Sequence, residues 1–264
     1  MLRLDETFHN PVKELLKQKK KVCGGWLQLC SPMSAEIMGK AGFDFLMVDM
    51  EHAPNDVFLL IQQLQALKGY GVTPLARAPW NDMVAIKRIL DAGVYGLLVP
   101  YVNTRAEAEQ AVANTKYPTL GVRGVAPSPR APGFGMNSKN YMEHANDELL
   151  VMTAVETPEA VQNLDEILKV PGLDGIFIGP MDLATSMGHF CDPSASEVQA
   201  AIAQVEQKVF ASDKYLATVA KDMDAAKKLY DRGYSMILSM SDSGYLAQGA
   251  MATAKKFREF YPER

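Results

Sequence analysis

Apolar runs of about five residues alternate with amphipathic stretches along this chain. A short apolar run that ends at Gly or Pro and leads into a helical pattern is typical of a buried parallel strand. We therefore predict strands over Val22–Leu29, Phe43–Asp49, Thr73–Arg77, Gly96–Val102, Leu149–Glu156, Gly175–Gly179, Tyr215–Ala220 and Ser235–Met240. Helices are predicted over Ser34–Ala41, Asn55–Gly69, Asn81–Ala92, Thr104–Thr115, Pro158–Leu168, Ser194–Ala211, Asp222–Arg232 and Ser241–Phe260.

Eight strand–helix units in one chain are what a closed (β/α)8 TIM barrel requires. Gly42, Gly93, Gly172 and Gly233 stand where a helix ends and the next strand begins, the usual place for a glycine after a helix. The alternative is an open doubly wound sheet. However, no GxGxxG or GxxxxGK[ST] motif follows the first strand, so nothing supports dinucleotide or P-loop binding. With no linker or composition break, we predict a single barrel domain over residues 1–264.

One stretch, Tyr117–Asp147, is rich in Gly and Pro and interrupts the fourth unit. A long irregular segment inside a compact domain is usually functional or disordered. It carries Arg123 and Arg130, which are flanked by small residues rather than by acids. These arginines are either surface residues of an insertion, cationic contacts for an acidic substrate, or contacts within an oligomer.

Composition restricts the partners of this 264-residue chain, of which 48% is hydrophobic and whose net charge is −4. A mild negative charge argues against a general binder of nucleic acid. No segment approaches the roughly 20 apolar residues of a membrane helix. The 3 cysteines form no CxxC motif and no plausible disulfide framework. We therefore expect a cytoplasmic protein with a small-molecule substrate and with neither membrane nor nucleic acid as a partner.

Two of the predicted strands are followed by acids, Glu156 and Asp182. The carboxyl ends of parallel strands meet on the rim where α/β enzymes carry out their chemistry. Two carboxylates on adjacent strands, without Cys or His between them, suit a divalent cation such as Mg²⁺, Mn²⁺ or Co²⁺. The alternative is that both acids stabilise the N-termini of the helices that follow.

The same rim receives polar groups from two earlier strands. Asp49, Glu51 and His52 follow the second strand, and Arg77 ends the third. Taken singly, Arg77 could be a structural ion-pair partner and His52 a hydrogen-bonded loop residue. Together, a base, a cation and two metal-type acids on one rim form a set suited to enolate chemistry.

At this point the chain resembles the HpcH/HpaI class II aldolase family of the phosphoenolpyruvate/pyruvate barrel superfamily. The segments that carry the resemblance span most of the chain. They are Gly42-Phe43-Asp44, Val48-Asp49-Met50-Glu51-His52-Ala53-Pro54-Asn55, Arg77-Ala78-Pro79, Leu90-Asp91-Ala92-Gly93, Leu98-Val99-Pro100, Gly121-Val122-Arg123-Gly124, Val155-Glu156-Thr157 and Ile178-Gly179-Pro180-Met181-Asp182-Leu183.

The resemblance implies a metal-dependent lyase that cleaves a 4-hydroxy-2-oxo acid to pyruvate and an aldehyde through an enolate of pyruvate. The substrate would be 4-hydroxy-2-oxoheptanedioate or a 2-keto-3-deoxy sugar acid. Glu156 and Asp182 would hold the cation, and Arg77 would stabilise the charge on the 2-oxo oxygen. His52 would act on the 4-hydroxyl proton.

The resemblance also implies supporting roles. Asp91 would be the carboxylate partner of His52, and Asp49 and Glu51 would contact water around the metal. Backbone N–H groups of Met181 and Asp182, after Gly179, would receive the pyruvate carboxylate. The last helix, Ser241–Phe260, would pack against a neighbouring subunit in a homohexamer built from dimers.

The chain departs from the family pattern at Ala154, where the family usually has a Gln that contacts substrate. This change leaves the substrate open. One alternative is a citrate-lyase-like enzyme that acts on a CoA thioester, or a decarboxylase. Another is a Schiff-base aldolase that uses Lys221, and a third is a barrel that has lost turnover.

Overall fold

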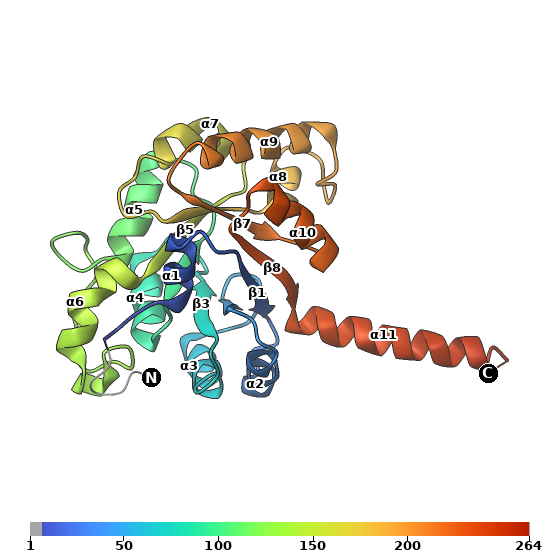
Figure 1. The fold of residues 1–264 in the computed structure, drawn as a ribbon, viewed down its shortest axis with the longest axis horizontal. Coiled ribbons are helices and arrows are strands. Elements are labelled where there is room, and N and C mark those ends of the chain that lie inside the picture. Colours follow the sequence, from blue (N-terminus) through green and yellow to red (C-terminus); the bar gives the residue numbers. More distant parts are fainter. Residues whose placement is uncertain (1–6, 264) are drawn as a thin grey trace.

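The computed structural model describes residues 7–263 of the chain. Eight parallel strands form a closed barrel in sequence order, and β1 pairs with β8 to complete it (Figure 1). The predicted (β/α)8 barrel is therefore confirmed. The strands are β1 (Val22–Leu27), β2 (Phe45–Asp49), β3 (Thr73–Arg77), β4 (Gly96–Val99), β5 (Leu150–Val155), β6 (Gly175–Ile178), β7 (Tyr215–Val219) and β8 (Met236–Ser241).

Each predicted helix is also present, within a few residues of its predicted ends. These helices are α2 (Pro32–Lys40), α3 (Val57–Ala66), α4 (Met83–Ala92), α5 (Arg105–Thr115), α7 (Pro158–Ile167), α9 (Ser196–Phe210), α10 (Met223–Arg232) and α11 (Asp242–Phe260). At the N-terminus of most of these helices, the side chain of the N-cap residue accepts a backbone hydrogen bond. Asp56, Asp82 and Asp222 each accept a hydrogen bond from the backbone N–H three residues on, which satisfies a donor that the helix leaves free.

Three further helices are present, namely α1 (Pro11–Lys17), α6 (Ser138–Glu148) and α8 (Pro180–Ser186). The first two were not predicted, whereas a helix was expected to open after Gly179-Pro180, although without a predicted end. The stretch Tyr117–Asp147 is therefore irregular only in its first part, which ends with the 3-10 turn η1 (Gly133–Gly135). Val12 and Leu16 of α1 pack with Val22 and Phe45, the first residues of β1 and β2. This contact places α1 against the amino-terminal end of the barrel, so the opposite rim is the one left for a site.

The last helix, α11, does not cover the barrel as the others do. Figure 1 shows it extending away from the strands, and within its 19 residues only Asp242 is buried. Leu246, Phe257 and Phe260 share one face of the helix and are 65%, 40% and 65% exposed. They form an apolar stripe on α11 that the rest of the chain, over the described residues 7–263, leaves exposed.

The described part of the chain has no helix that is both long and apolar enough to cross a membrane. Cys23, Cys30 and Cys191 are free thiols.

Candidate active site

The centre of the rim is an ion pair between Asp49 and Arg77. The two residues end β2 and β3 and are register partners. Arg77 donates from Nε to Oδ1 of Asp49 at 3.0 Å and from Nη2 to Oδ2 at 2.7 Å. Bidentate pairing of this kind fixes the guanidinium in orientation as well as in position.

Asp49 is completely buried and accepts further hydrogen bonds from Gln28 Nε2 at 2.9 Å and from the N–H groups of Glu51 and His52. Burial by itself raises the pKa of this carboxyl. The hydrogen bonds and charge of Arg77 outweigh that effect, together with the hydrogen bonds from Gln28 and from the backbone of His52. The pKa of Asp49 therefore lies below its ordinary value. Asp49 is therefore an ionised support for Arg77, with its oxygens already engaged.

Arg77 is held on its other sides as well. Its guanidinium carbon lies 4.4 Å from the ring centroid of Trp26, and Nη1 lies 3.1 Å from Oε2 of Glu51. The side chain is 8% exposed. A cation stacked on an aromatic ring and bracketed by two carboxylates has little freedom to move.

Glu156 directly follows β5 and is 2% exposed. Its Oε2 accepts a hydrogen bond from the N–H of Tyr101 at 3.0 Å. The carboxylate rests against the backbone of Gly179, where an added Cβ would lie 2.7 Å from Oε1 and Cγ. Any side chain at position 179 would therefore displace Glu156.

The acids at this rim affect one another. Burial, opposed by the Tyr101 N–H and reinforced by the charges of Glu51 and Asp182, raises the pKa of Glu156 to about 7. Burial also raises the pKa of Glu51 to about 7, with Arg77 opposing and Asp49 and Asp182 adding to the effect. A buried cluster with this surplus of negative charge favours a positive partner.

A divalent cation fits this set of residues. Glu156 and Asp182, which lies in the first turn of α8, offer hard oxygen ligands. Within residues 7–263, no group of three or more His, Cys, Asp or Glu side chains is placed to hold an ion. Two carboxylates with water and substrate are nevertheless how Mg²⁺ is usually held. In addition, Oε2 of Glu51 is buried without a hydrogen-bond partner among the described residues, and a water in the site could provide one.

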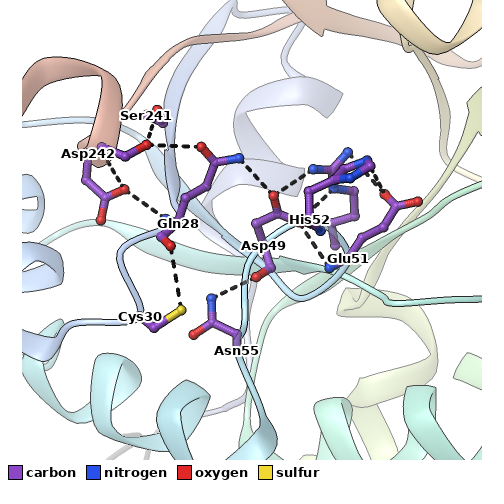
Figure 2. A network of polar contacts seen from close by, with 10 residues as sticks. Gln28, Cys30, Asp49, Glu51, His52, Asn55, Ser241 and Asp242 are labelled. Atoms are coloured by element: carbon purple, nitrogen blue, oxygen red, sulfur yellow. Dashed lines mark hydrogen bonds and ion pairs between the residues drawn. The ribbon is translucent and has the colours of Figure 1, made fainter. Parts of the chain in front are cut away.

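His52 lies on the solvent side of this cluster, with its side chain 54% exposed. Its Nε2 is 3.6 Å from Oε2 of Glu51, so the carboxylate beside it in this chain is Glu51. Figure 2 shows His52 and Glu51 on the loop that follows Asp49.

Asp91 and Arg123 lie elsewhere, which departs from the expected pairing of Asp91 with His52. Asp91 is in the last turn of α4, and its Oδ1 accepts a hydrogen bond from Arg123 Nη2 at 2.7 Å. Arg123 is 1% exposed and stacks on the rings of Tyr117 and Tyr141. A helix that follows a barrel strand runs back from the rim, so its last turn lies near the other end of the barrel. Within one chain, Asp91 therefore cannot reach His52.

Arg130 also lies away from the rim, because its Nη1 donates to the carbonyl oxygen of Ala92 at the end of α4. Of the remaining predicted residues, Gly179 and Met181 flank Pro180 at the start of α8, beside Glu156. Lys221 follows β7 and is exposed. Ala154 is fully buried in the barrel interior, in one cluster with Trp26 and Phe177.

Three residues of the site were missed from the sequence, namely Gln28, Trp26 and Tyr101. Gln28 directly follows β1, and Tyr101 comes two residues after β4. Both therefore obey the rule that residues after each strand converge on the rim, although the predicted strands, Val22–Leu29 and Gly96–Val102, had included both residues. Trp26 gave no signal, because an aromatic residue in a buried strand is ordinarily core.

The chain is similar to known proteins over most of its length. The family described as HpcH/HpaI aldolase/citrate lyase matches residues 23–248. A 5-keto-4-deoxy-D-glucarate aldolase of Escherichia coli O139:H28 is 39% identical over 97% of this chain and 99% of its own length. An HpcH/HpaI family protein from Burkholderia cenocepacia J2315 superposes with a TM-score of 0.90 at 34% identity, covering 94% of this chain and 99% of that one. An HpcH/HpaI aldolase from Desulfitobacterium hafniense DCB-2 does so with a TM-score of 0.88 at 29% identity, covering 96% and 98%.

Proposed function

The chain belongs to the HpcH/HpaI aldolase/citrate lyase family and is a carbon–carbon lyase, and we propose that it cleaves a 4-hydroxy-2-oxo sugar acid to pyruvate and an aldehyde. The observation that carries the proposal is the fixed guanidinium of Arg77 beside the carboxylates of Glu51 and Glu156 on one rim. The full-length similarity to 5-keto-4-deoxy-D-glucarate aldolase supports a sugar acid as the substrate.

We propose a divalent cation as the cofactor, held by Glu156 and Asp182. When bound, such an ion supplies a Lewis acid that lowers the cost of negative charge on the 2-oxo oxygen of the substrate. Glu51 supports the same site, because its Oε2, which is ion-paired with Arg77 but has no hydrogen-bond partner among the described residues, can accept a hydrogen bond from a water there. Backbone N–H groups of Met181 and Asp182 are the proposed contacts for the substrate carboxylate.

Arg77 is proposed to stabilise the 2-oxo oxygen as it becomes an enolate oxygen. Its guanidinium is held by two bonds to Asp49 and by the ring of Trp26 before any substrate arrives. A charge that is already in place needs no reorganisation when the reaction occurs, and this is the main source of electrostatic catalysis.

His52 is proposed to remove the proton of the 4-hydroxyl group. The C3–C4 bond then breaks, the aldehyde leaves, and the bonding electrons form the enolate of pyruvate. A proton delivered to C3 completes pyruvate. Glu51, 3.6 Å from Nε2 of His52, can stabilise the imidazolium that forms in the first step.

Assembly belongs to the same proposal. The exposed stripe of α11 is suited to a second copy of this chain, and the family resemblance points to a hexamer of three dimers. Because Asp91 and His52 lie far apart within one chain, a pairing of these two residues requires a neighbouring subunit.

The cleavage itself can be tested directly. Purified protein with Mg²⁺ or Mn²⁺ is incubated with 5-keto-4-deoxy-D-glucarate, 2-keto-3-deoxy sugar acids and 4-hydroxy-2-oxoheptanedioate, and pyruvate is followed with lactate dehydrogenase and NADH. Pyruvate released fastest from a sugar acid supports the proposal. Turnover of a CoA thioester with no pyruvate from any hydroxy-oxo acid contradicts it.

A further inference from the structure

We propose that Gln28 is a positioning residue that links the start of α11 to the Asp49–Arg77 pair. The consequence for catalysis rests on the proposed function of Arg77. The link itself rests only on contacts that the structure contains (Figure 2).

The side chain of Gln28 spans two elements. Its Nε2 donates to Oδ2 of Asp49 at 2.9 Å, and its Oε1 accepts from Oγ of Ser243 at 3.3 Å. The ionised carboxylate of Asp49 can only accept, so the NH₂ end of the amide must face it. The carbonyl end is then left for the hydroxyl group of Ser243, and both halves of the amide are used.

The backbone of Gln28 is tied to the same helix. Its N–H donates to Oδ1 of Asp242 at 2.8 Å. Asp242 is 6% exposed and also accepts from Oγ of Ser34 at 2.5 Å and from the N–H of Ser243. The first turn of α11 is thus anchored to β1 and α2 through buried charge-assisted hydrogen bonds.

Gln28 and Arg77 share one carboxylate oxygen of Asp49. Oδ2 of Asp49 accepts from both Gln28 Nε2 and Arg77 Nη2, whereas Oδ1 accepts from Arg77 Nε and from two backbone N–H groups. Loss of the amide leaves the buried Oδ2 with Arg77 Nη2 as its one partner among the described residues. The carboxylate can then rotate, and Arg77 moves with it.

A coupling follows from this arrangement. Beyond its first turn α11 is exposed, and a second copy of this chain is the proposed occupant of that exposed face. Asp242 and Ser243 belong to the same helix, so a displacement of α11 on assembly would act on them, and Gln28 would pass it to Asp49. Assembly through α11 would therefore set the orientation of Arg77.

Gln28→Leu removes both amide contacts at nearly constant volume. We expect kcat to fall about tenfold with KM within about twofold, the usual cost of losing such a supporting bond. We expect no loss of assembled mass by light scattering. Gln199→Leu, the same change on the exposed face of α9, should leave kcat unchanged. Gln28→Glu separates hydrogen bonding from packing, because it fills the same space but cannot donate when ionised. It should be at least as impaired as Gln28→Leu, and full activity of Gln28→Glu would overturn the proposal.

The link to α11 is tested by Ser243→Ala, which keeps the contact between Gln28 and Asp49. Combined with Gln28→Leu, it should cost no more than Gln28→Leu alone, because the two changes interrupt one path. Additive losses in kcat would contradict the coupling to α11.

A crystal structure of Gln28→Leu gives a result that does not depend on activity. We expect the contact between Arg77 Nη2 and Asp49 Oδ2 to lengthen beyond hydrogen-bond distance, and an Arg77 that stays in place overturns the positioning role. A wild-type protein that releases no pyruvate, together with a displaced Arg77 in the variant, would refute the proposed function but support the role of Gln28.

Discussion

Asp49 and Arg77 are register partners at the last positions of β2 and β3, and their side chains meet in two hydrogen bonds. The register of a parallel sheet sets the separation of the two backbones, so the pair is part of the barrel rather than of a mobile loop. The guanidinium of Arg77, which is proposed to stabilise the enolate, is therefore held in place by the pairing of two barrel strands.

Replacing Asp49 should reveal this structural role through its dependence on pH. The pKa of Asp49 is lowered in the folded protein, so its contribution to stability is complete above the unfolded value of 3.8 and is lost as pH falls through the lower folded value. Asp49→Asn should lower the free energy of unfolding by about 3–5 kcal/mol near neutral pH, because Arg77 loses its partner. Below about pH 4 the difference from wild type should shrink. Urea unfolding at a fixed protomer concentration measures it, and an equal gap at both pH values would count against the assignment.

Arg77→Lys tests whether orientation matters beyond charge. Lysine keeps the positive charge but cannot form two parallel bonds to Asp49 or stack in the same way on Trp26. We expect both aldol cleavage and proton exchange of pyruvate to fall by about 10²–10³-fold, since both pass through an enolate. If the variant keeps either activity at the wild-type rate, Arg77 does not stabilise the enolate.

His52→Ala should separate the two activities. His52 is proposed to act on the 4-hydroxyl group, which pyruvate lacks, so cleavage should fall by about 10²–10⁴-fold while exchange of pyruvate protons falls less. Both rates can be measured on one preparation. If His52→Ala keeps full cleavage activity, the base lies elsewhere, and Glu51 is the next candidate because its pKa is raised to about 7.

The exposed stripe of α11 makes a prediction about assembly. Leu246 is 65% exposed, and a carboxylate there would be buried in any interface that covers the stripe. Leu246→Glu should lower the mass found by light scattering at micromolar concentration. Lys255, whose side chain is 80% exposed, lies nine residues further along and so on the opposite face of the helix, and Lys255→Glu serves as the control. A wild-type protein that is monomeric at this concentration would refute the interface.

Much of this architecture could be predicted from the pattern of the chain. The alternation of short apolar runs with amphipathic stretches located every strand, and the rule that residues after parallel strands converge brought Arg77 and Glu156 to one rim. Helix α6 was missed because Pro and Gly dominate the residues before it, and its own sequence is polar with only Tyr141 and Ala145 buried.

Other features depend on the register between strands and on contacts between residues far apart in the chain. The pattern of apolar and polar positions contains neither. Asp49 binds Arg77 because their strands pair, although the two residues lie 28 positions apart along the chain. That Arg123 binds Asp91, rather than facing the rim, depends on where α4 ends. The last helix was predicted over nearly its observed residues, yet periodicity alone cannot say whether its own barrel or another subunit covers its apolar stripe.

The most direct test of the central claim uses pyruvate alone. The protein is incubated with pyruvate in heavy water, and loss of the methyl proton signal is followed by NMR with added Mg²⁺ or Mn²⁺, with EDTA, and with EDTA followed by Mn²⁺. Our account predicts that proton exchange requires the divalent ion, is abolished by EDTA and returns with Mn²⁺. It also predicts that the Arg77→Lys variant exchanges these protons far more slowly than wild type. Undiminished exchange in EDTA, with pyruvate trapped on Lys221 by borohydride, would contradict it.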